Sequence, residues 1–173
     1  LDAFLVLGFI AAIVAVARRV DTMKMQWLGF AGMTVGMLML ALAAGSASPP
    51  HPSGVSGPAW ALILTVVGFA LFNFSVNAGP NPATYLHGAE LFECHMRGTG
   101  HGFAASSGKL GAMTGLFLLP ILQEISLSLA LLSVAGVCVL GMGLTIVLNR
   151  MLVRRSRLAA APAPVAFAEE APG

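Results

Sequence analysis

The sequence predicts an all-α polytopic membrane protein with about five transmembrane helices. Hydrophobic residues make up 57% of the 173 residues and charged residues only 9%, and the mean hydropathy is +0.87, which is far from the values of a water-soluble domain. Long apolar segments are the second observation, because each approaches the ~20 residues that a helix needs to cross ~30 Å of hydrocarbon. They are Ala3–Ala17, Gln26–Ala44, Ala59–Leu91, Phe103–Leu122 and Ile125–Leu148. Residues 1–150 are therefore the predicted five-helix transmembrane part.

The first segment is short, because the chain begins within it. Leu1 stands where a start methionine would be, and the run that follows lacks the basic start and small-residue cleavage site of a signal peptide. We therefore expect a fragment whose N-terminal helices are missing. The two cysteines, Cys94 and Cys138, suit neither a disulfide framework nor a zinc site and are expected to be free thiols.

Basic residues distinguish the two ends of the predicted helices. The connections after the first, third and fifth segments carry eight of the nine lysines and arginines, whereas the other two connections carry none. The eight are Arg18, Arg19, Lys24, Arg97, Arg150, Arg154, Arg155 and Arg157. The positive-inside rule places this side in the cytoplasm, so we expect a multi-pass protein of the plasma (inner) membrane with a cytoplasmic C-terminus. Residues 151–173 are predicted to be a disordered cytoplasmic tail.

Polar residues gather between residues 73 and 115, in the middle of this oily chain. Asparagines recur there at every fourth position, which makes one polar stripe on a helix; they are Asn73, Asn77 and Asn81. Gly79, Pro80 and Pro82 interrupt the same helix, because proline lacks the N–H donor and glycine loosens the turn. Backbone carbonyls freed at membrane depth are tolerated only where they line protein or a water-filled cavity. The stretch is therefore predicted to face a polar cavity, as a transport site does.

A single lysine, Lys109, lies inside the apolar segment Phe103–Leu122. An ammonium at membrane depth is costly, and ionisable groups there are functional by default. The alternative is that its long side chain snorkels to the cytoplasmic surface, ~9 Å away along the helix. We favour the functional interpretation.

Small residues recur in the helices at the spacing that allows close packing. Gly32 and Gly36 form one GxxxG pair and Gly111 and Gly115 another. Such pairs let the backbones of two transmembrane helices approach closely, so tight helix contacts are predicted at both.

Several motifs between residues 77 and 112 follow one another with a fixed spacing. They are Gly79-Pro80-Asn81, Thr84, Tyr85, Glu90, Phe92, Arg97, His101-Gly102 and Gly108-Lys109. This series resembles the tenth and eleventh helices of major facilitator superfamily transporters, and most closely those of the phosphate:proton symporter family. The resemblance implies that the chain is the C-terminal portion of a twelve-helix fold, with its segments as helices eight to twelve.

The resemblance also implies roles for individual residues. In the phosphate symporters the asparagine at the position of Asn81 contacts the anion, and the lysine at the position of Lys109 lies close to it. An amide N–H₂ and an ammonium are suitable donors for phosphate oxygens. Further substrate-site candidates are Asn77, Thr84 and Tyr85, although polar residues in membranes often serve only as contacts between helices.

Glu90 and Arg97 lie near the predicted cytoplasmic end, where the resemblance implies charge-pair residues that close the inner side of a transporter. Arg18 and Arg19 are their candidate partners. The alternative is a solvated surface pair, which is worth ~0–1 kcal/mol.

These features predict a secondary transporter that moves a small anionic solute by alternating access, and the resemblance implies inorganic phosphate and protons as the leading pair of substrates. Its other expected partners are the lipid bilayer and the missing N-terminal helices of the same protein. A sugar or organic-acid proton symporter is the alternative within transport, and a membrane interaction protein without transport is the alternative outside it. No enzyme activity, cofactor, metal site or nucleic-acid partner is expected, because no nucleophile and base pair or metal-ligand spacing occurs.

Overall fold

The computed structural model describes residues 2–46 and 58–159, and these form helices without any strand. The helices are α1 (Asp2–Ala17), α2 (Thr22–Gly45), α3 (Ala59–Ala78), α4 (Pro80–Leu91), α5 (Arg97–Ile125) and α6 (Leu127–Ala159). Four spans in this part of the chain are long and apolar enough to cross a membrane, with α1 as a shorter apolar helix. The predicted all-α polytopic fold is confirmed.

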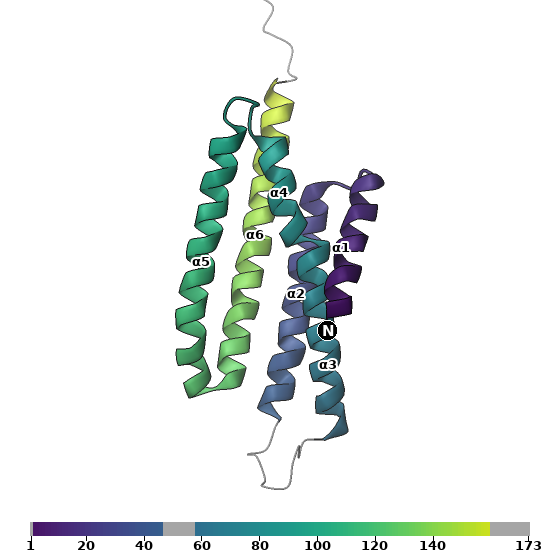
Figure 1. Cartoon of the computed structure of the whole chain (residues 1–173), viewed down its shortest axis with the longest axis vertical. Coiled ribbons are helices and arrows are strands. Elements are labelled where there is room, and N and C mark those ends of the chain that lie inside the picture. Colours follow the sequence, from purple (N-terminus) through teal and green to yellow (C-terminus); the bar gives the residue numbers. More distant parts are fainter. Residues whose placement is uncertain (1, 47–57, 160–173) are drawn as a thin grey trace, which may run out of the picture.

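Helix α2 is the centre of the bundle. It packs against α3 on one side and α6 on the other (Figure 1). Helix α1 packs against α3, and α5 packs mainly against α6 and α4. The buried core joins the central helices, with Met37 and Leu40 of α2 against Ala135 of α6. Large apolar side chains elsewhere are exposed, as on α5, where Leu116 is 72% exposed. Such a surface is suited to lipid or to further helices, not to water.

Glycines allow the backbones of α2 and α3 to touch. A Cβ on Gly36 would lie 2.7 Å from the carbonyl oxygen of Gly68, and a Cβ on Gly32 would collide with the Ser75 hydroxyl. The close contact predicted for Gly32 and Gly36 is therefore confirmed. Gly111 and Gly115 contact no other helix within the described residues, because a Cβ on either would meet nothing within 4 Å, so the close contact at this pair stays a prediction.

Several helices extend beyond the apolar segments that predicted them. Helix α2 begins at Thr22 because the Asp21 carboxylate accepts a hydrogen bond from the Met23 N–H and caps it. Helix α5 begins at Arg97, six residues before the predicted Phe103. Residues 151–159, predicted to be disordered, belong to α6, because arginines near a helix C-terminus favour the helix and no glycine or proline interrupts it. The remainder of the predicted tail, 160–173, lies outside the described residues.

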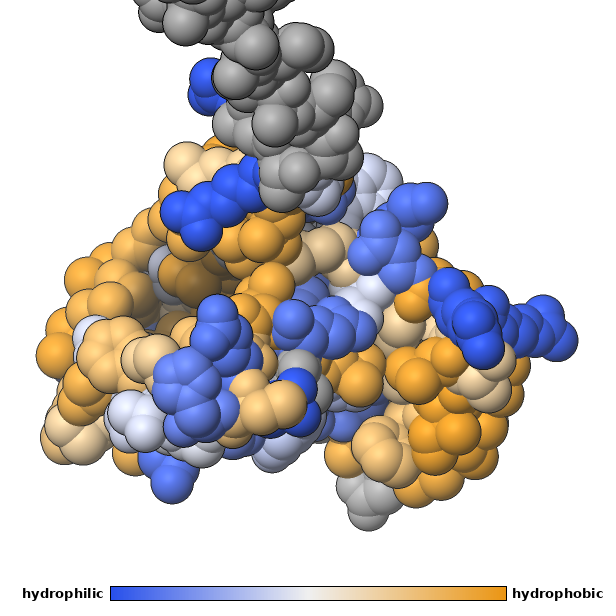
Figure 2. All heavy atoms as spheres, turned by 90° about the horizontal axis from the view of Figure 1, so that it is seen from above, coloured by the Kyte–Doolittle hydropathy of each residue, from blue (hydrophilic) through white to orange (hydrophobic). Residues whose placement is uncertain are grey.

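Most basic residues of the described part of the chain lie at one end of the bundle. The turns from α1 to α2 and from α4 to α5 and the C-terminal end of α6 all lie at the top of Figure 1. This end carries Arg18, Arg19, Lys24, Arg97, Arg150, Arg154 and Arg155. Figure 2 looks onto it and shows hydrophilic side chains spread across this face and out to its right edge, with hydrophobic residues mainly on the left and at the lower right. We call it the basic end.

Candidate functional site

The third predicted segment is broken where glycine and proline occur. Helix α3 ends at Ala78, Gly79 has φ −127° and ψ −90°, and α4 begins at Pro80. The prolines at 80 and 82 have no N–H, so the carbonyls of Val76 and Ala78 lack the amide donors of a regular helix. The predicted interruption is confirmed, and it leaves polar backbone groups in the middle of an apolar segment.

The asparagine stripe runs across this break as a chain of hydrogen bonds. The side-chain amide of Asn73 donates to the Phe69 carbonyl at 2.8 Å, and that of Asn77 donates to the Asn73 carbonyl at 3.1 Å. The Asn81 amide donates to the Asn77 side-chain oxygen at 3.0 Å, so one residue of α4 is tied to one of α3. Asn81 is exposed, and its amide keeps a second N–H that no described group accepts.

Thr84 and Tyr85 follow on the first turns of α4. The Thr84 hydroxyl donates to the Pro80 carbonyl at 2.9 Å, within its own helix. Tyr85 is 66% exposed, and its ring centroid lies 5.8 Å from that of His101 on α5. It also lines an apolar cavity of about 350 Å³ together with Phe9 of α1. Tyr85 of α4 thus contacts α5 through His101 and borders α1 across this cavity.

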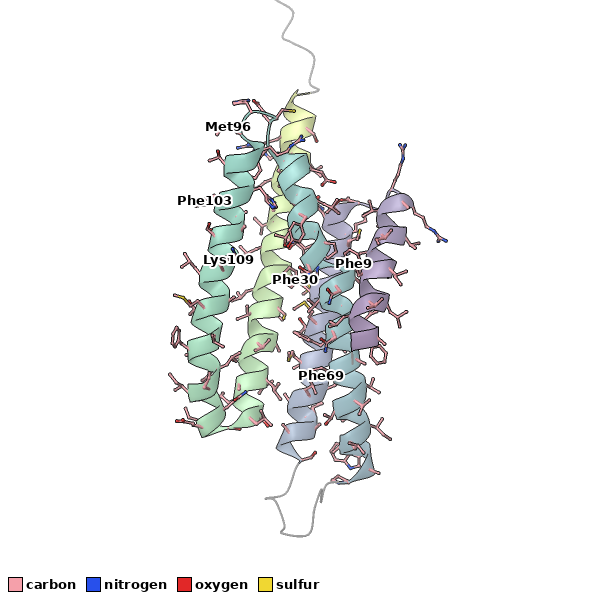
Figure 3. All side chains as sticks on the ribbon, in the orientation of Figure 1. Phe9, Phe30, Phe69, Met96, Phe103 and Lys109 are labelled. Atoms are coloured by element: carbon pink, nitrogen blue, oxygen red, sulfur yellow. The ribbon has the colours of Figure 1, made fainter. Side chains whose placement is uncertain are left out.

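Lys109 lies twelve residues after Arg97, ~18 Å along α5, and below Phe103 in the view of Figure 3. The side chain is exposed and makes neither a hydrogen bond nor an ion pair to a described residue. No hydrogen bond joins it to Asn81 within that part of the chain. None of the residues of α5 is buried, so the face that carries Lys109 is open in this structure. Its ammonium is available to a ligand or to a further part of the protein.

The predicted gate residue Glu90 has partners that the sequence did not indicate. The Thr22 hydroxyl of α2 donates to Glu90 Oε1 at 2.9 Å, and His87 Nδ1 lies 3.8 Å from Glu90 Oε2. His87 also forms a short hydrogen bond through Nε2 to Gln26 of α2. These contacts fix the end of α4 to the start of α2. The only sequence signals were the Asp21-Thr22 cap and the spacing of His87 and Glu90 by one helical turn.

Arg19 and Glu90 line the same cavity of about 310 Å³. Arg19 has φ 55°, and its N–H donates to the Val16 carbonyl while the Val20 N–H donates to the Ala15 carbonyl, both at 2.9 Å. This is a Schellman turn, in which the left-handed position normally holds glycine. An arginine there costs ~1–2 kcal/mol, and a strained residue beside a polar cavity is a functional candidate.

None of Arg18, Arg19 and Arg97 forms an ion pair with Glu90 within the described residues, although Arg97 begins α5 at the same end of the bundle. Glu93 Oε2 and His95 Nδ1 lie 3.5 Å apart on the exposed turn between α4 and α5. Among the described residues, no group of three or more His, Cys, Asp or Glu side chains could hold a metal ion. Cys94 is exposed and Cys138 buried, and both are free.

The sequence is similar to those of known membrane transporters. Residues 3–152 match the family described as sugar (and other) transporter. The chain is 38% identical over 127 residues to probable inorganic phosphate transporter 1-6 of Arabidopsis thaliana. This match covers 70% of this chain and 22% of that protein. It is 30% identical over 161 residues to probable inorganic phosphate transporter 1-9 of Oryza sativa subsp. japonica, covering 86% of this chain and 26% of that protein. No solved structure matches the chain significantly. The chain thus spans about a quarter of the length of these relatives.

Proposed function

This chain belongs to the sugar (and other) transporter family of the major facilitator superfamily, and on that premise we propose that it is part of a symporter for inorganic phosphate and protons. The substrate choice is supported by relatives that are named inorganic phosphate transporters and are 30–42% identical to it. The observation that carries this proposal is the break between α3 and α4. There the exposed side-chain amide of Asn81, near the start of α4, lies beside backbone carbonyls that lack helical donors. Broken helices are where secondary transporters bind their substrates.

The proposed anion site combines α3, α4 and α5. Asn81 donates an N–H to a phosphate oxygen, and Lys109 supplies the positive charge that offsets the anion in a medium of low dielectric. Asn77 orients the Asn81 amide through their 3.0 Å hydrogen bond. Thr84 and Tyr85 are the proposed lining on the next turn. The facing helices and the proton-coupling carboxylate are proposed to come from other parts of the protein, since alternating access needs two bundles.

The test of this function is uptake by the full-length gene product in proteoliposomes with an imposed proton gradient. We expect saturable accumulation of phosphate that a protonophore abolishes, and no accumulation of glucose. The family is described as that of sugar (and other) transporters, so glucose uptake without phosphate uptake would support the sugar alternative. Failure to move either solute would favour a membrane interaction protein.

The inner gate is proposed to consist of Glu90 and Arg97, with Arg18 and Arg19 as partners. Glu90 and Arg19 share one cavity, so reversing both charges (Arg19→Glu with Glu90→Arg) should restore part of the uptake that either change alone removes. Residues of one charge network show coupling energies of ~0.5–3 kcal/mol in such cycles. Initial rates of phosphate uptake for the four proteins measure the coupling. The same cycle with Arg97 and Glu90 tests the second pair, and purely additive losses in both cycles would leave only solvated charges.

The orientation is a further proposal, with the basic end in the cytoplasm and the protein in the plasma membrane. A cysteine introduced at Arg97 or Arg154 of the full-length protein should react with a membrane-impermeant maleimide only after the membrane is opened. A cysteine at His51, which lies outside the described residues, should react in intact cells. The reverse labelling pattern would invert the topology.

A further inference from the structure

A cluster of polar side chains fixes the end of α4 to the start of α2. The Thr22 hydroxyl donates to Glu90 Oε1 at 2.9 Å, and His87 bonds through Nε2 to Gln26. The start of α4 is attached separately, because the Gly79 backbone lies against the backbone of α2. Helix α4 is therefore held to α2 at both of its ends. His87 belongs to none of the motifs that indicated transport.

The two ring nitrogens of His87 have different surroundings. The atom at Nε2 is the side-chain oxygen Oε1 of Gln26, which can only accept a hydrogen bond, so Nε2 carries a hydrogen. Nδ1 is buried and has no hydrogen-bond partner among the described residues. A ring with its hydrogen on Nε2 and a bare Nδ1 is the neutral form of histidine. The side chain is only 13% exposed, so the cluster fits a neutral ring.

A second proton, on Nδ1, would find no acceptor at hydrogen-bond distance in this arrangement. Glu90 Oε2 lies 3.8 Å from Nδ1, which is beyond that distance. The other oxygen of the same carboxylate accepts the hydrogen bond from Thr22. A buried donor without an acceptor destabilises the arrangement that buries it. The charged ring is better accommodated where water or a rearranged Glu90 can accept from Nδ1.

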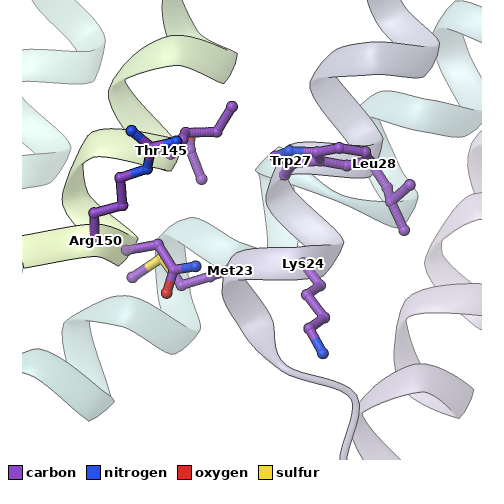
Figure 4. A pocket seen from close by; sticks show the side chains of 8 residues that line it. Met23, Lys24, Trp27, Leu28, Thr145 and Arg150 are labelled. Carbon is purple, nitrogen blue, oxygen red and sulfur yellow. The ribbon is translucent and has the colours of Figure 1, made fainter. Parts of the chain in front are cut away.

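Other titratable and charged groups surround this ring on the neighbouring elements. Burial opposes a positive charge on it, whereas the carboxylates of Glu90 and Asp21 favour one. His101 of α5 packs against the next residue of α4, and Arg19 lines the cavity that contains Glu90. Lys24 of α2 belongs to a different cavity of about 400 Å³, formed with α6 (Figure 4). Helix α3 carries no charged residue. The two carboxylates reduce the effect of burial, but neither accepts a hydrogen bond from Nδ1.

We propose that His87 is a proton-binding residue whose charged form releases the end of α4 from α2. The proton binds to the bare Nδ1, and the break at Gly79 is the point about which α4 moves. The attached arrangement is thus favoured at neutral and alkaline pH and is lost as the pH falls. Because α4 carries Asn81 and Glu90, its release changes the position of the anion site and of the inner gate. That consequence rests on the proposed function, whereas the release itself does not.

The experiment measures amide hydrogen exchange of α4 by mass spectrometry, with the full-length gene product in lipid nanodiscs and a buffer without phosphate. Rates are taken at about pH 5.5 and about pH 8, which lie on either side of the ordinary titration of histidine, and are corrected for the intrinsic effect of pH on exchange. We expect the protection of α4 to be on the order of tenfold lower at the acidic pH. A tenfold difference in the proton affinity of the ring between two states changes their ratio tenfold. The protection of α6 should not change.

His87→Gln stays neutral at both pH values and should remove the acid response of α4. The matched control is His95→Gln, because His95 also lies near a carboxylate, that of Glu93, but its side chain is 71% exposed. This control should keep the response, and Glu90→Gln should keep it too, since the ring of His87 remains.

Equal or higher protection of wild-type α4 at the acidic pH would overturn the proposal, whatever the variants do. A response that persists in His87→Gln, or that disappears in Glu90→Gln or His95→Gln, would assign the titration to another group and overturn it as well. Because no phosphate is present, these results are independent of whether the protein transports that anion.

Discussion

Replacing Lys109 with glutamine is expected to weaken phosphate binding by the full-length protein about 10- to 150-fold, because a hydrogen bond to a charged group is worth ~1.5–3 kcal/mol. The structure adds that no described residue pairs with this ammonium. Its removal therefore leaves no buried carboxylate without a partner in this part of the chain, and the thermal midpoint should change little. Phosphate titration of the two purified proteins, with thermal unfolding followed in parallel, measures both quantities.

Two further variants sharpen this result. Lys109→Arg keeps the charge and should retain most of the affinity, whereas Asn81→Ala should lose a separate hydrogen bond to the anion. A large loss of stability in Lys109→Gln, with an unchanged dissociation constant, would assign the lysine to a carboxylate of the facing helices. That outcome would remove Lys109 from the anion site.

Replacing Gly79 with alanine is expected to destabilise the folded protein. A Cβ there would lie 2.6 Å from the Gly29 Cα and 2.6 Å from the Met25 carbonyl oxygen, both backbone atoms of α2 that cannot move aside. Overpacking of this kind costs ~1–3 kcal/mol, and relief of the clash would separate the helix break from α2. We expect a lower thermal midpoint and reduced phosphate binding, because Asn81 follows two residues later.

Gly143→Ala is the matched control, because a Cβ on Gly143 of α6 would meet nothing within 4 Å. Alanine favours a helix over glycine by ~1 kcal/mol, so this variant should be as stable as the wild type or slightly more so. Equal stability of the Gly79→Ala and Gly143→Ala proteins would contradict the close approach of α2 to the break.

The sequence was sufficient for the features that depend on local chemistry. Hydropathy located the membrane segments, proline and glycine located the break before Pro80, and the four-residue spacing of asparagines predicted a stripe that crosses it. Helix ends were less predictable, since hydropathy does not detect polar helical turns such as that at Arg97.

Contacts between residues far apart in the chain could not be predicted from the sequence. The hydrogen bond from the Thr22 hydroxyl to the Glu90 carboxylate joins residues 68 positions apart, and no local sequence pattern predicts it. The left-handed backbone conformation of Arg19 could not be predicted either, because that position normally holds glycine. The GxxxG spacing of Gly111 and Gly115 is the same as that of Gly32 and Gly36, yet only the latter pair contacts a helix in the described residues. Spacing indicates that a close approach is possible, and only the packing shows where it occurs.

The helix break and Lys109 are proposed to recognise an anion and not a sugar. Equilibrium binding of phosphate and of glucose to the purified full-length protein, measured by calorimetry without any gradient, tests it most directly. We expect saturable binding of phosphate that is unaffected by excess glucose and weakened in Asn81→Ala. Saturable binding of glucose, with no heat from phosphate, would contradict it.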